Sequence, residues 1–167
     1  MRSFRLGLPG FLLLFLGLSN LAVAAAEAAT IVALGASNTY GKGVARNQSY
    51  PAQLEAILRA KGSNVRVVNA GINGDTTEGM LARLDRAVPN GTSAVILQPG
   101  GNDRRKGSPD RTADIRSRLA ARGIPVIMLE NGMLHGLPHQ PDGQHLTPDG
   151  YHILAEQLAS QVAGAIR

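Results

Sequence analysis

The sequence predicts an α/β fold, a three-layer α/β/α sandwich built on a small parallel sheet of about four strands. Short, continuous apolar runs alternate along the chain with segments whose apolar residues recur at helical spacing. Such runs are typical of strands buried on both faces, and strands that alternate with helices favour a parallel sheet covered on both sides. The length of 167 residues, with 44% hydrophobic and 17% charged residues, fits one globular domain.

Four apolar runs are the predicted strands. The first three are each followed by a turn that contains glycine, a residue that commonly closes a strand. The runs span residues 31–34, 65–68, 94–97 and 124–129.

Four helices are predicted between and after these strands, each from apolar residues three or four positions apart. The first begins near Tyr50 and Pro51 and stops near Gly62, because proline suits a first helical turn and glycine suits a stop. The last opens at Thr147 and Pro148, where the threonine can cap the helix N-terminus. The helical patterns cover residues 50–58, 80–88, 115–119 and 148–162.

The start of the chain has the layout of a secretory signal peptide. Arg2 and Arg5 form a short positive start, an apolar run follows over residues 6–18, and small residues then lead to Ala29. A permanent membrane anchor is the alternative. A spanning helix needs about 20 apolar residues, however, and Pro9 interrupts this run.

This segment sets the predicted domain organisation. We expect a cleaved signal peptide over residues 1–29 and one mature domain over residues 30–167. The product is then secreted or periplasmic, with no permanent membrane span in its mature form.

Composition excludes several classes of function. Aromatic residues make up 4% of the chain and Trp is absent, so a nucleic-acid binder that stacks bases on aromatic side chains is not expected. The net charge of +5 invites a comparison with nucleic-acid binders, but the densest basic group, residues 104–106, is too short to follow a phosphate backbone. The absence of Cys excludes disulfides, a cysteine nucleophile and thiolate metal sites.

Polar residues gather just after the predicted strands, where ligands bind in parallel α/β sheets. The turn over residues 35–43 is rich in glycine, yet it departs from the P-loop pattern because Gly43 stands where Ser or Thr is needed. It also departs from the dinucleotide-binding pattern, because Ser37 stands where the second glycine belongs. What remains is a serine directly beyond a buried strand, either a nucleophile or an ordinary turn former.

A nucleophilic serine needs a base, and the base needs a group that orients it. Asp142 stands three residues before His145, just ahead of the last predicted helix. Within one tight turn, its carboxylate can reach the imidazole Nδ1. An Asp-Gly turn beside an exposed histidine is the alternative interpretation of this spacing.

The same segment also allows a metal site, since His135, His139, Asp142 and His145 fall close together in the sequence. Prolines within the segment, however, break the helix that would align His135 with His139. His152, on the last predicted helix, is expected to be a surface or packing residue.

Four blocks, in this order, resemble the SGNH or GDSL-type hydrolase family. Residues 35–41 (Gly-Ala-Ser-Asn-Thr-Tyr-Gly) resemble its Gly-Asp-Ser-Leu block and residues 69–77 its second block. Residues 100–103 (Gly-Gly-Asn-Asp) resemble its third block and residues 142–145 (Asp-Gly-Gln-His) its last. Any one block is weak, but four in order, each past a predicted strand or before the final helix, are a strong signal. By these motifs the chain is most similar to small periplasmic esterases, thioesterases and lysophospholipases.

The resemblance implies a flavodoxin-like SGNH hydrolase fold and a serine esterase that cleaves acyl esters or thioesters through a covalent acyl-enzyme. It places the nucleophile at Ser37, the base at His145 and the acid at Asp142. It places the oxyanion hole at the backbone N–H groups of Ser37 and Gly74 and at the side-chain amide of Asn102. The implied substrate is a small-molecule, lipid or glycan acyl ester, and we expect no nucleic acid, no cofactor and no metal.

Two departures from the family's pattern matter. The family's aspartate before the nucleophile is Ala36 here, and its loss need not abolish the chemistry because that aspartate is not a triad member. Residues 103–141 leave room for one helix and one strand where relatives usually fit a further strand–helix unit, so we expect a smaller sheet and a more open site. Two other functions stay open: a non-catalytic module that binds a ligand on the same fold, and a metal-dependent hydrolase that uses residues 135–145.

Overall fold

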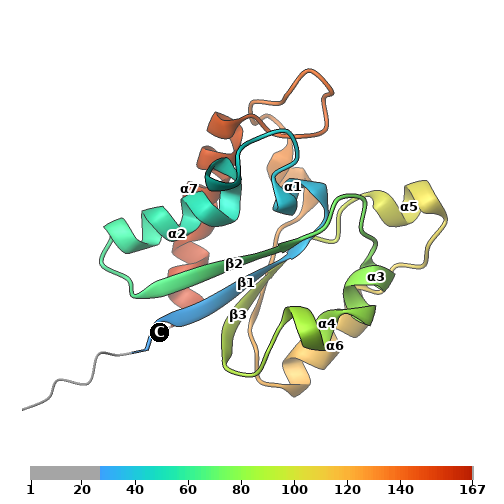
Figure 1. Cartoon of the computed structure of the whole chain (residues 1–167). Coiled ribbons are helices and arrows are strands. Elements are labelled where there is room, and N and C mark those ends of the chain that lie inside the picture. Colours follow the sequence, from blue (N-terminus) through green and yellow to red (C-terminus); the bar gives the residue numbers. More distant parts are fainter. Residues whose placement is uncertain (1–26, 167) are drawn as a thin grey trace, which may run out of the picture.

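The four predicted strands form one parallel sheet. The computed structural model describes residues 27–166, and in this part of the chain the strand order is β2-β1-β3-β4 (Figure 1). The chain passes from β1 to β2 on one side and then returns to place β3 on the other side of β1. Such a reversal leaves a crevice beyond the carboxyl ends of the strands, where ligands bind in these folds. The strands are β1 (Ala29–Gly35), β2 (Val65–Gly71), β3 (Thr92–Leu97) and β4 (Val126–Met128).

Helices cover both faces of the sheet, which confirms the predicted three-layer sandwich. One face carries α2 (Tyr50–Ala60) and α7 (Pro148–Ala165) (Figure 1). The other face carries α3 (Thr77–Ala82), α4 (Leu84–Ala87) and α6 (Thr112–Ala121). The remaining elements are short: α1 (Ser37–Tyr40), α5 (Asn102–Lys106) and the 3-10 turns η1 (Arg46–Gln48) and η2 (Asn131–Leu134).

The apolar strands explain why the sheet is buried on both faces. Successive side chains of a strand point to opposite faces, so Ile31 and Ala33 of β1 enter the core under α2 and α7. Val32 and Leu34 enter the second core, which packs against α3, α4 and α6. All four side chains are fully buried. Burying a Val, Leu or Ile side chain stabilises a fold by about 1.5–3 kcal/mol. Because the apolar run is continuous, β1 is stabilised by packing against both helical layers.

The helix predicted over residues 80–88 is instead two short helices, α3 and α4, that meet at Arg83. Arg83 leaves helical geometry, with φ −105° and ψ 7°. Its guanidinium binds the Asp75 carboxylate, and its Nη2 donates to the Gly35 carbonyl oxygen at 3.3 Å. The apolar spacing could not show this break, because the residues on both sides of it still face the same core.

The fourth strand is shorter than the predicted residues 124–129. Pro125 has no N–H to donate to the sheet, although its carbonyl oxygen accepts from the Val95 N–H at 3.0 Å. The Leu129 N–H donates to the Leu97 carbonyl oxygen at 2.9 Å, just beyond the paired residues. The prediction is therefore right about the strand and wrong about its ends.

The last helix begins as predicted. The Thr147 Oγ1 accepts a hydrogen bond from the Gly150 N–H at 3.2 Å, and Pro148 occupies the first turn. Over residues 27–166, no helix is long and apolar enough to cross a membrane.

The predicted signal peptide lies almost wholly outside the described residues. Its predicted boundary falls at the first residue of β1, where Ala29 pairs with Val65 and donates its N–H to the Asn64 carbonyl oxygen at 2.9 Å. Cleavage after Ala29 would therefore shorten β1 by one residue, whereas a cut a few residues earlier would leave the strand whole.

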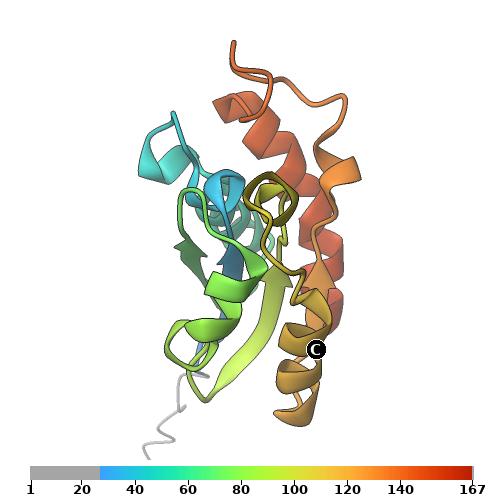
Figure 2. The same cartoon turned by 90° about the vertical axis from the view of Figure 1, so that its right-hand side faces the viewer.

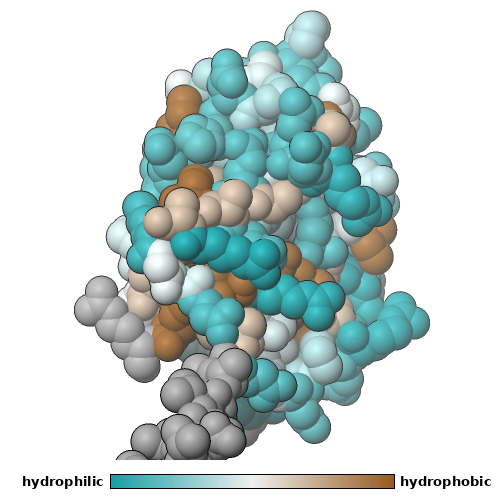
Figure 3. Space-filling model, turned by 60° about the vertical axis from the view of Figure 1, so that its left-hand side comes forward, coloured by the Kyte–Doolittle hydropathy of each residue, from teal (hydrophilic) through white to brown (hydrophobic). Residues whose placement is uncertain are grey.

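The surface is mixed in polarity. On the face shown in Figure 3, hydrophobic side chains reach the surface in patches that hydrophilic side chains separate. Over the described residues, the large apolar side chains with the greatest exposure are Tyr40, Ile72 and Ile153, and they belong to three different segments. Single exposed apolar side chains of this kind are normal on a globular protein.

Candidate active site

The loops that follow β1 and β3 converge with the segment before α7 at the carboxyl ends of the strands. Figures 1 and 2 show this segment, in orange-red, on the same side of the sheet's end as α1. The three stretches line a cleft of about 370 Å³. Ser37, Asn102 and His145 all line this cleft, so the structure brings together residues that are far apart in the sequence.

Ser37, His145 and Asp142 form a continuous chain of hydrogen bonds. The His145 Nε2 lies 2.9 Å from the Ser37 Oγ, and the His145 Nδ1 lies 2.6 Å from the Asp142 Oδ2. His145 is buried, whereas the Asp142 side chain is 43% exposed. The histidine is therefore enclosed, and the carboxylate behind it is partly exposed to solvent.

The Asp142 carboxylate also organises the turn that carries His145. Its Oδ1 accepts the backbone N–H groups of Gln144 and His145, each at 3.0 Å. The turn passes through Gly143 with φ +64°, a conformation that glycine adopts without a steric penalty. Side-chain hydrogen bonds to backbone N–H groups two and three positions ahead are typical of aspartate turns.

These hydrogen bonds keep Asp142 ionised. The bond from His145, followed by the backbone N–H groups of Gln144 and His145, holds the pKa of the Asp142 carboxyl well below its ordinary value of 3.8. The group is thus a full negative charge at neutral pH, facing the Nδ1 of His145.

Asn38 links the serine turn to the histidine turn. Its Nδ2 donates to the Gln144 carbonyl oxygen at 3.0 Å, and its Oδ1 accepts from the Tyr151 hydroxyl at 3.0 Å. Tyr151 is fully buried, and burial raises its pKa, so the hydroxyl keeps its proton and remains a donor. Through Asn38, the first turn of α7 braces the two loops that hold Ser37 and His145.

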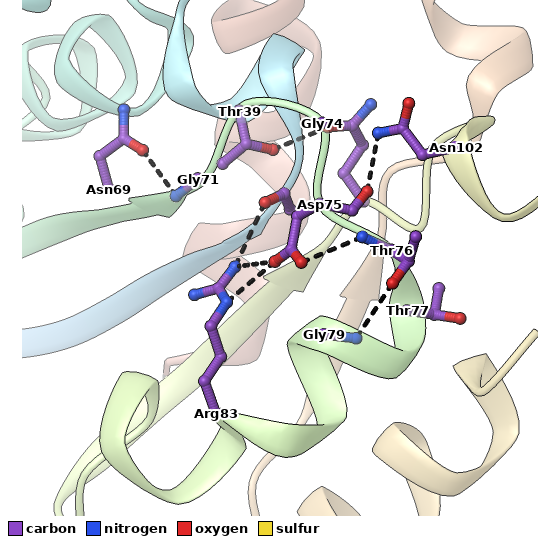
Figure 4. A network of polar contacts seen from close by, with 12 residues as sticks. Thr39, Asn69, Gly71, Gly74, Asp75, Thr76, Thr77, Gly79, Arg83 and Asn102 are labelled. Carbon is purple, nitrogen blue, oxygen red and sulfur yellow. Dashed lines mark hydrogen bonds and ion pairs between the residues drawn. The ribbon is translucent and has the colours of Figure 1, made fainter. Parts of the chain in front are cut away.

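Asn102 is buried at the start of α5, and its amide is oriented from both ends. Its Nδ2 donates to the Asp75 carbonyl oxygen at 2.7 Å (Figure 4), and its Oδ1 accepts a short hydrogen bond from the Arg105 Nη2. A guanidinium can only donate and a carbonyl oxygen can only accept, so the two partners specify which end of the amide faces which. An Nδ2 group carries two hydrogens, and one of them remains beyond the bond to Asp75.

Asp75 anchors the loop after β2, as Figure 4 shows. Its carboxylate binds Arg83 through the Nε at 2.9 Å and the Nη2 at 2.8 Å, and it also accepts the Thr76 N–H at 3.0 Å. Both side chains of the ion pair are nearly buried, at 11% and 10% exposure. Because Arg83 also reaches the Gly35 carbonyl oxygen, this pair connects the end of β1 to the loop that holds Gly74.

Gly74 lies on that loop with φ +72°, and its carbonyl oxygen accepts from the Lys106 Nζ at 2.6 Å. Its neighbour Asp75 is the residue that Asn102 contacts. Of the predicted site residues, Ser37, Asn102 and His145 line the cleft, whereas Gly74 and Asp142 do not. Among the described residues, none accepts a hydrogen bond from the backbone N–H of Gly74 or of Ser37.

Ala36 is packed into the apolar core. It is 2% exposed and belongs to the same core as Met80, Leu84 and Leu97. It also lines the cleft, so the carboxylate that the family pattern expects here is replaced by a methyl group between the apolar core and the cleft.

Sequence reasoning missed the residues that brace the site. Asn38 sits directly after Ser37, Gln144 directly before His145, and Arg105 three positions after Asn102. Arg105 joins two of these parts, because its Nη1 donates to the Gln144 Oε1 at 2.6 Å. The sequence did show the basic group over residues 104–106 that contains Arg105. That group was used only to argue against nucleic-acid binding, because it is too short to follow a phosphate backbone.

The histidines of the segment before α7 do not gather into a metal site. Over the described residues, no three His, Cys, Asp or Glu side chains are placed to hold one ion. His135 and His139 line the cleft, while His145 is engaged by Ser37 and Asp142. His152 lies on α7, half exposed, beside Gln53 and Glu156.

This sandwich, with the serine, histidine and aspartate at its strand ends, is similar to the crystal structure of AlinE4, an SGNH-hydrolase family esterase, with a TM-score of 0.55 and 27% identity over 84% of this chain and 75% of that one. The chain belongs to the GDSL-like lipase/acylhydrolase family, whose sequence profile matches residues 33–161.

Named relatives agree with this assignment. The chain is 34% identical over 110 residues to the esterase TesA of Pseudomonas aeruginosa, covering 62% of this chain and 55% of the relative. It is 32% identical over 116 residues to an arylesterase of Vibrio mimicus, covering 66% and 58%. A crystal structure of TesA has the same fold, with a TM-score of 0.72 and 24% identity over 81% of this chain and 99% of that one. The chain thus spans somewhat more than half the length of the curated relatives that it matches.

Proposed function

We propose that this protein is a serine esterase that hydrolyses carboxylic esters or thioesters through a covalent acyl-enzyme. The observation that carries the proposal is the hydrogen-bonded chain from Ser37 through His145 to Asp142 at the wall of an open cleft. Membership of the acylhydrolase family supports the same reaction class.

In the first half-reaction, the Ser37 Oγ attacks the acyl carbonyl carbon while the His145 Nε2 takes the hydroxyl proton. The tetrahedral intermediate collapses as the bond to the leaving alcohol or thiol breaks, and His145 returns the proton to that group. Water then attacks the acyl-Ser37 ester while His145 takes one of its protons. The bond between the acyl carbon and the Ser37 Oγ breaks, His145 returns the proton to Oγ, and the carboxylic acid leaves. The distance of 2.9 Å between Oγ and Nε2 lies within the range for this proton transfer.

Asp142 acts on His145 and not on the substrate. Its low pKa keeps it ionised while His145 gains and loses a proton. The charge holds the Nδ1 proton in place, so Nε2 is free to accept, and it stabilises the imidazolium that forms during the attack.

The oxyanion hole is proposed at the backbone N–H groups of Ser37 and Gly74 and at the second Nδ2 hydrogen of Asn102. The fixed orientation of the Asn102 amide supports this role, because a donor that is held before the reaction needs no reorganisation in the transition state. Removing one such donor typically lowers kcat by about 10²–10³.

The implied partner is a small-molecule, lipid or glycan acyl ester, and the proposed location is outside the cytoplasm. The steps above use only side chains of the protein and water, and they involve no cofactor. The location rests on the signal-like layout of residues 1–29.

The test of the proposal is labelling with a fluorophosphonate, followed by mass spectrometry to locate the modified residue. We expect one label on Ser37, loss of the label in Ser37→Ala, and loss of nearly all esterase activity in Ser37→Ala and His145→Ala alike. The matched control is His152→Ala, which removes a histidine of α7 that lies outside the site. A labelled Ser37→Ala variant, or one that keeps more than a few per cent of turnover, would refute the proposal, whereas an unlabelled wild type would favour the ligand-binding alternative.

A further inference from the structure

The cleft is lined by basic side chains. Those of Arg104 and Arg105 come from α5, and those of His135, His139 and His145 from the segment before α7. No Asp or Glu is among the described residues that line the cleft. Since the two arginines are always protonated, the cleft carries a positive charge that no lining carboxylate offsets.

The two arginines of the cleft differ in their contacts. Arg105 uses its guanidinium to hold the Asn102 and Gln144 side chains. Arg104 is exposed, and it forms no hydrogen bond or ion pair with any residue in the described part of the chain. Arg104 therefore keeps all of its donors available to a ligand.

No carboxylate in the described part of the chain lies within ion-pair distance of the Arg104 guanidinium, and three acidic residues of this region have other partners. Asp103 is buried, and its two carboxylate oxygens accept from the Thr77 N–H at 2.9 Å and the Thr77 hydroxyl at 2.8 Å. The Asp110 carboxylate borders a neighbouring hollow with Arg104, but it accepts from the Thr112 N–H and lies beyond ion-pair distance of the guanidinium. Asp142 is committed to His145.

We propose that the substrate carries an anionic group, a carboxylate or phosphate, close to the ester that is cleaved, and that Arg104 binds it. This inference rests on the proposed esterase function and adds the substrate class. An arginine fork matches the geometry of carboxylate and phosphate oxygens, and charge-assisted hydrogen bonds of this kind are the strong ones in proteins. A neutral ester gains nothing from the unpaired cation, whereas an anionic one gains both attraction and selectivity.

The test compares two pairs of substrates that differ only in charge. In the first pair the charge is on the acyl side: mono-p-nitrophenyl adipate and its methyl ester. In the second pair it is on the leaving group: p-acetoxyphenylpropionate and its methyl ester. For at least one pair, we expect kcat/KM to be about tenfold higher for the carboxylate, mainly through a lower KM, because the contact is made equally in the bound substrate and in the transition state.

Two further measurements assign the effect to Arg104. In Arg104→Met the ratio of the two kcat/KM values should fall to about one, whereas Arg118→Met, an exposed arginine on α6 with the same change in charge, should keep the wild-type ratio. In the wild type, raising the salt from about 50 mM to about 500 mM should reduce the ratio, since salt screens exposed charges.

Each outcome decides the inference. A preference in only one pair tells whether the anion belongs to the acyl part or to the leaving group. Equal rates in both pairs, or a preference that survives in Arg104→Met, would overturn the inference while leaving the esterase intact. If no substrate of either pair is hydrolysed, the proposed function fails and the inference fails with it.

Discussion

At the scale of single residues, the site depends on side chains outside the four sequence blocks of the family. Arg105 is the plainest case, because one guanidinium holds the Asn102 amide and the Gln144 side chain at once. We expect Arg105→Met to lower kcat on a neutral ester by about tenfold with little change in KM, since Asn102 would lose one of the two partners that orient its amide.

A double-mutant cycle checks this role. If Arg105 acts through Asn102, then Arg105→Met should cost much less in an Asn102→Ala background than in the wild type. Arg105→Lys, which restores one donor but not the fork, should recover part of the rate. Two independent, multiplicative losses would mean that Arg105 acts in some other way.

The surroundings of Ala36 determine how a substitution there affects stability. A carboxylate at this position would replace a methyl group that is 2% exposed and belongs to the same apolar core as Met80, Leu84 and Leu97, at the edge of the cleft. We expect Ala36→Asp to lose about 3 kcal/mol of stability, or roughly 10 °C in Tm, because an unpaired charge is costly among hydrocarbon side chains.

Calorimetry and kcat/KM of Ala36→Asp and Ala36→Asn together separate charge from volume, since the two side chains have nearly the same size. A Tm equal to that of the wild type, together with higher activity, would show that the new carboxylate finds a partner. Arg83, which contacts the Gly35 carbonyl oxygen next to it, would then be the first candidate.

At the scale of elements, the close approach of β2 to α1 sets the position of Ser37. A Cβ built on Gly71 would stand 2.2 Å from the Tyr40 backbone nitrogen, so only glycine lets the end of β2 pass under α1. We expect Gly71→Ala to displace α1 and thereby to lower both stability, by about 1–3 kcal/mol, and kcat.

The matched control is Gly132→Ala in η2, where a Cβ meets no atom within 4 Å. Thermal unfolding and steady-state kinetics of the two variants provide the comparison. Should Gly71→Ala unfold at the wild-type temperature and keep its turnover, the proposed dependence of Ser37 on this contact would be wrong.

At the scale of the whole molecule, β1 begins where the predicted signal peptide ends. Ala29 already pairs with Val65 in the sheet, so the predicted cleavage site lies at the first residue of β1. We expect the full chain, expressed in a Gram-negative bacterium, to appear outside the cytoplasm with its N-terminus close to Ala29.

Mass spectrometry of the secreted or periplasmic product measures that N-terminus. A cut before Ala29 keeps β1 complete and should give the more stable product. A chain that is recovered whole from the cytoplasm would refute the predicted signal peptide.

Much of the fold could be predicted because its signals are local. The continuous apolar run of β1 and the Thr147-Pro148 start of α7 each follow from residues that are adjacent or one helical turn apart. The break between α3 and α4 was missed for the opposite reason, since Arg83 leaves the helix to bind Asp75 and the end of β1.

The same contrast holds for the site. From the sequence alone came the order of the strands and helices along the chain, the candidates Ser37, Asp142, His145, Gly74 and Asn102, and the basic group over residues 104–106. The tertiary structure alone decided which side chains of separate segments meet, and it did so because parallel strands bring distant loops to one edge of the sheet. It set the Ser37–His145 distance and turned Arg105 toward Gln144. It also left Arg104 unpaired beside the cleft. No local spacing can specify the Ser37–His145 and Arg105–Gln144 contacts, because each joins segments that are separate in the chain and adjacent only after folding.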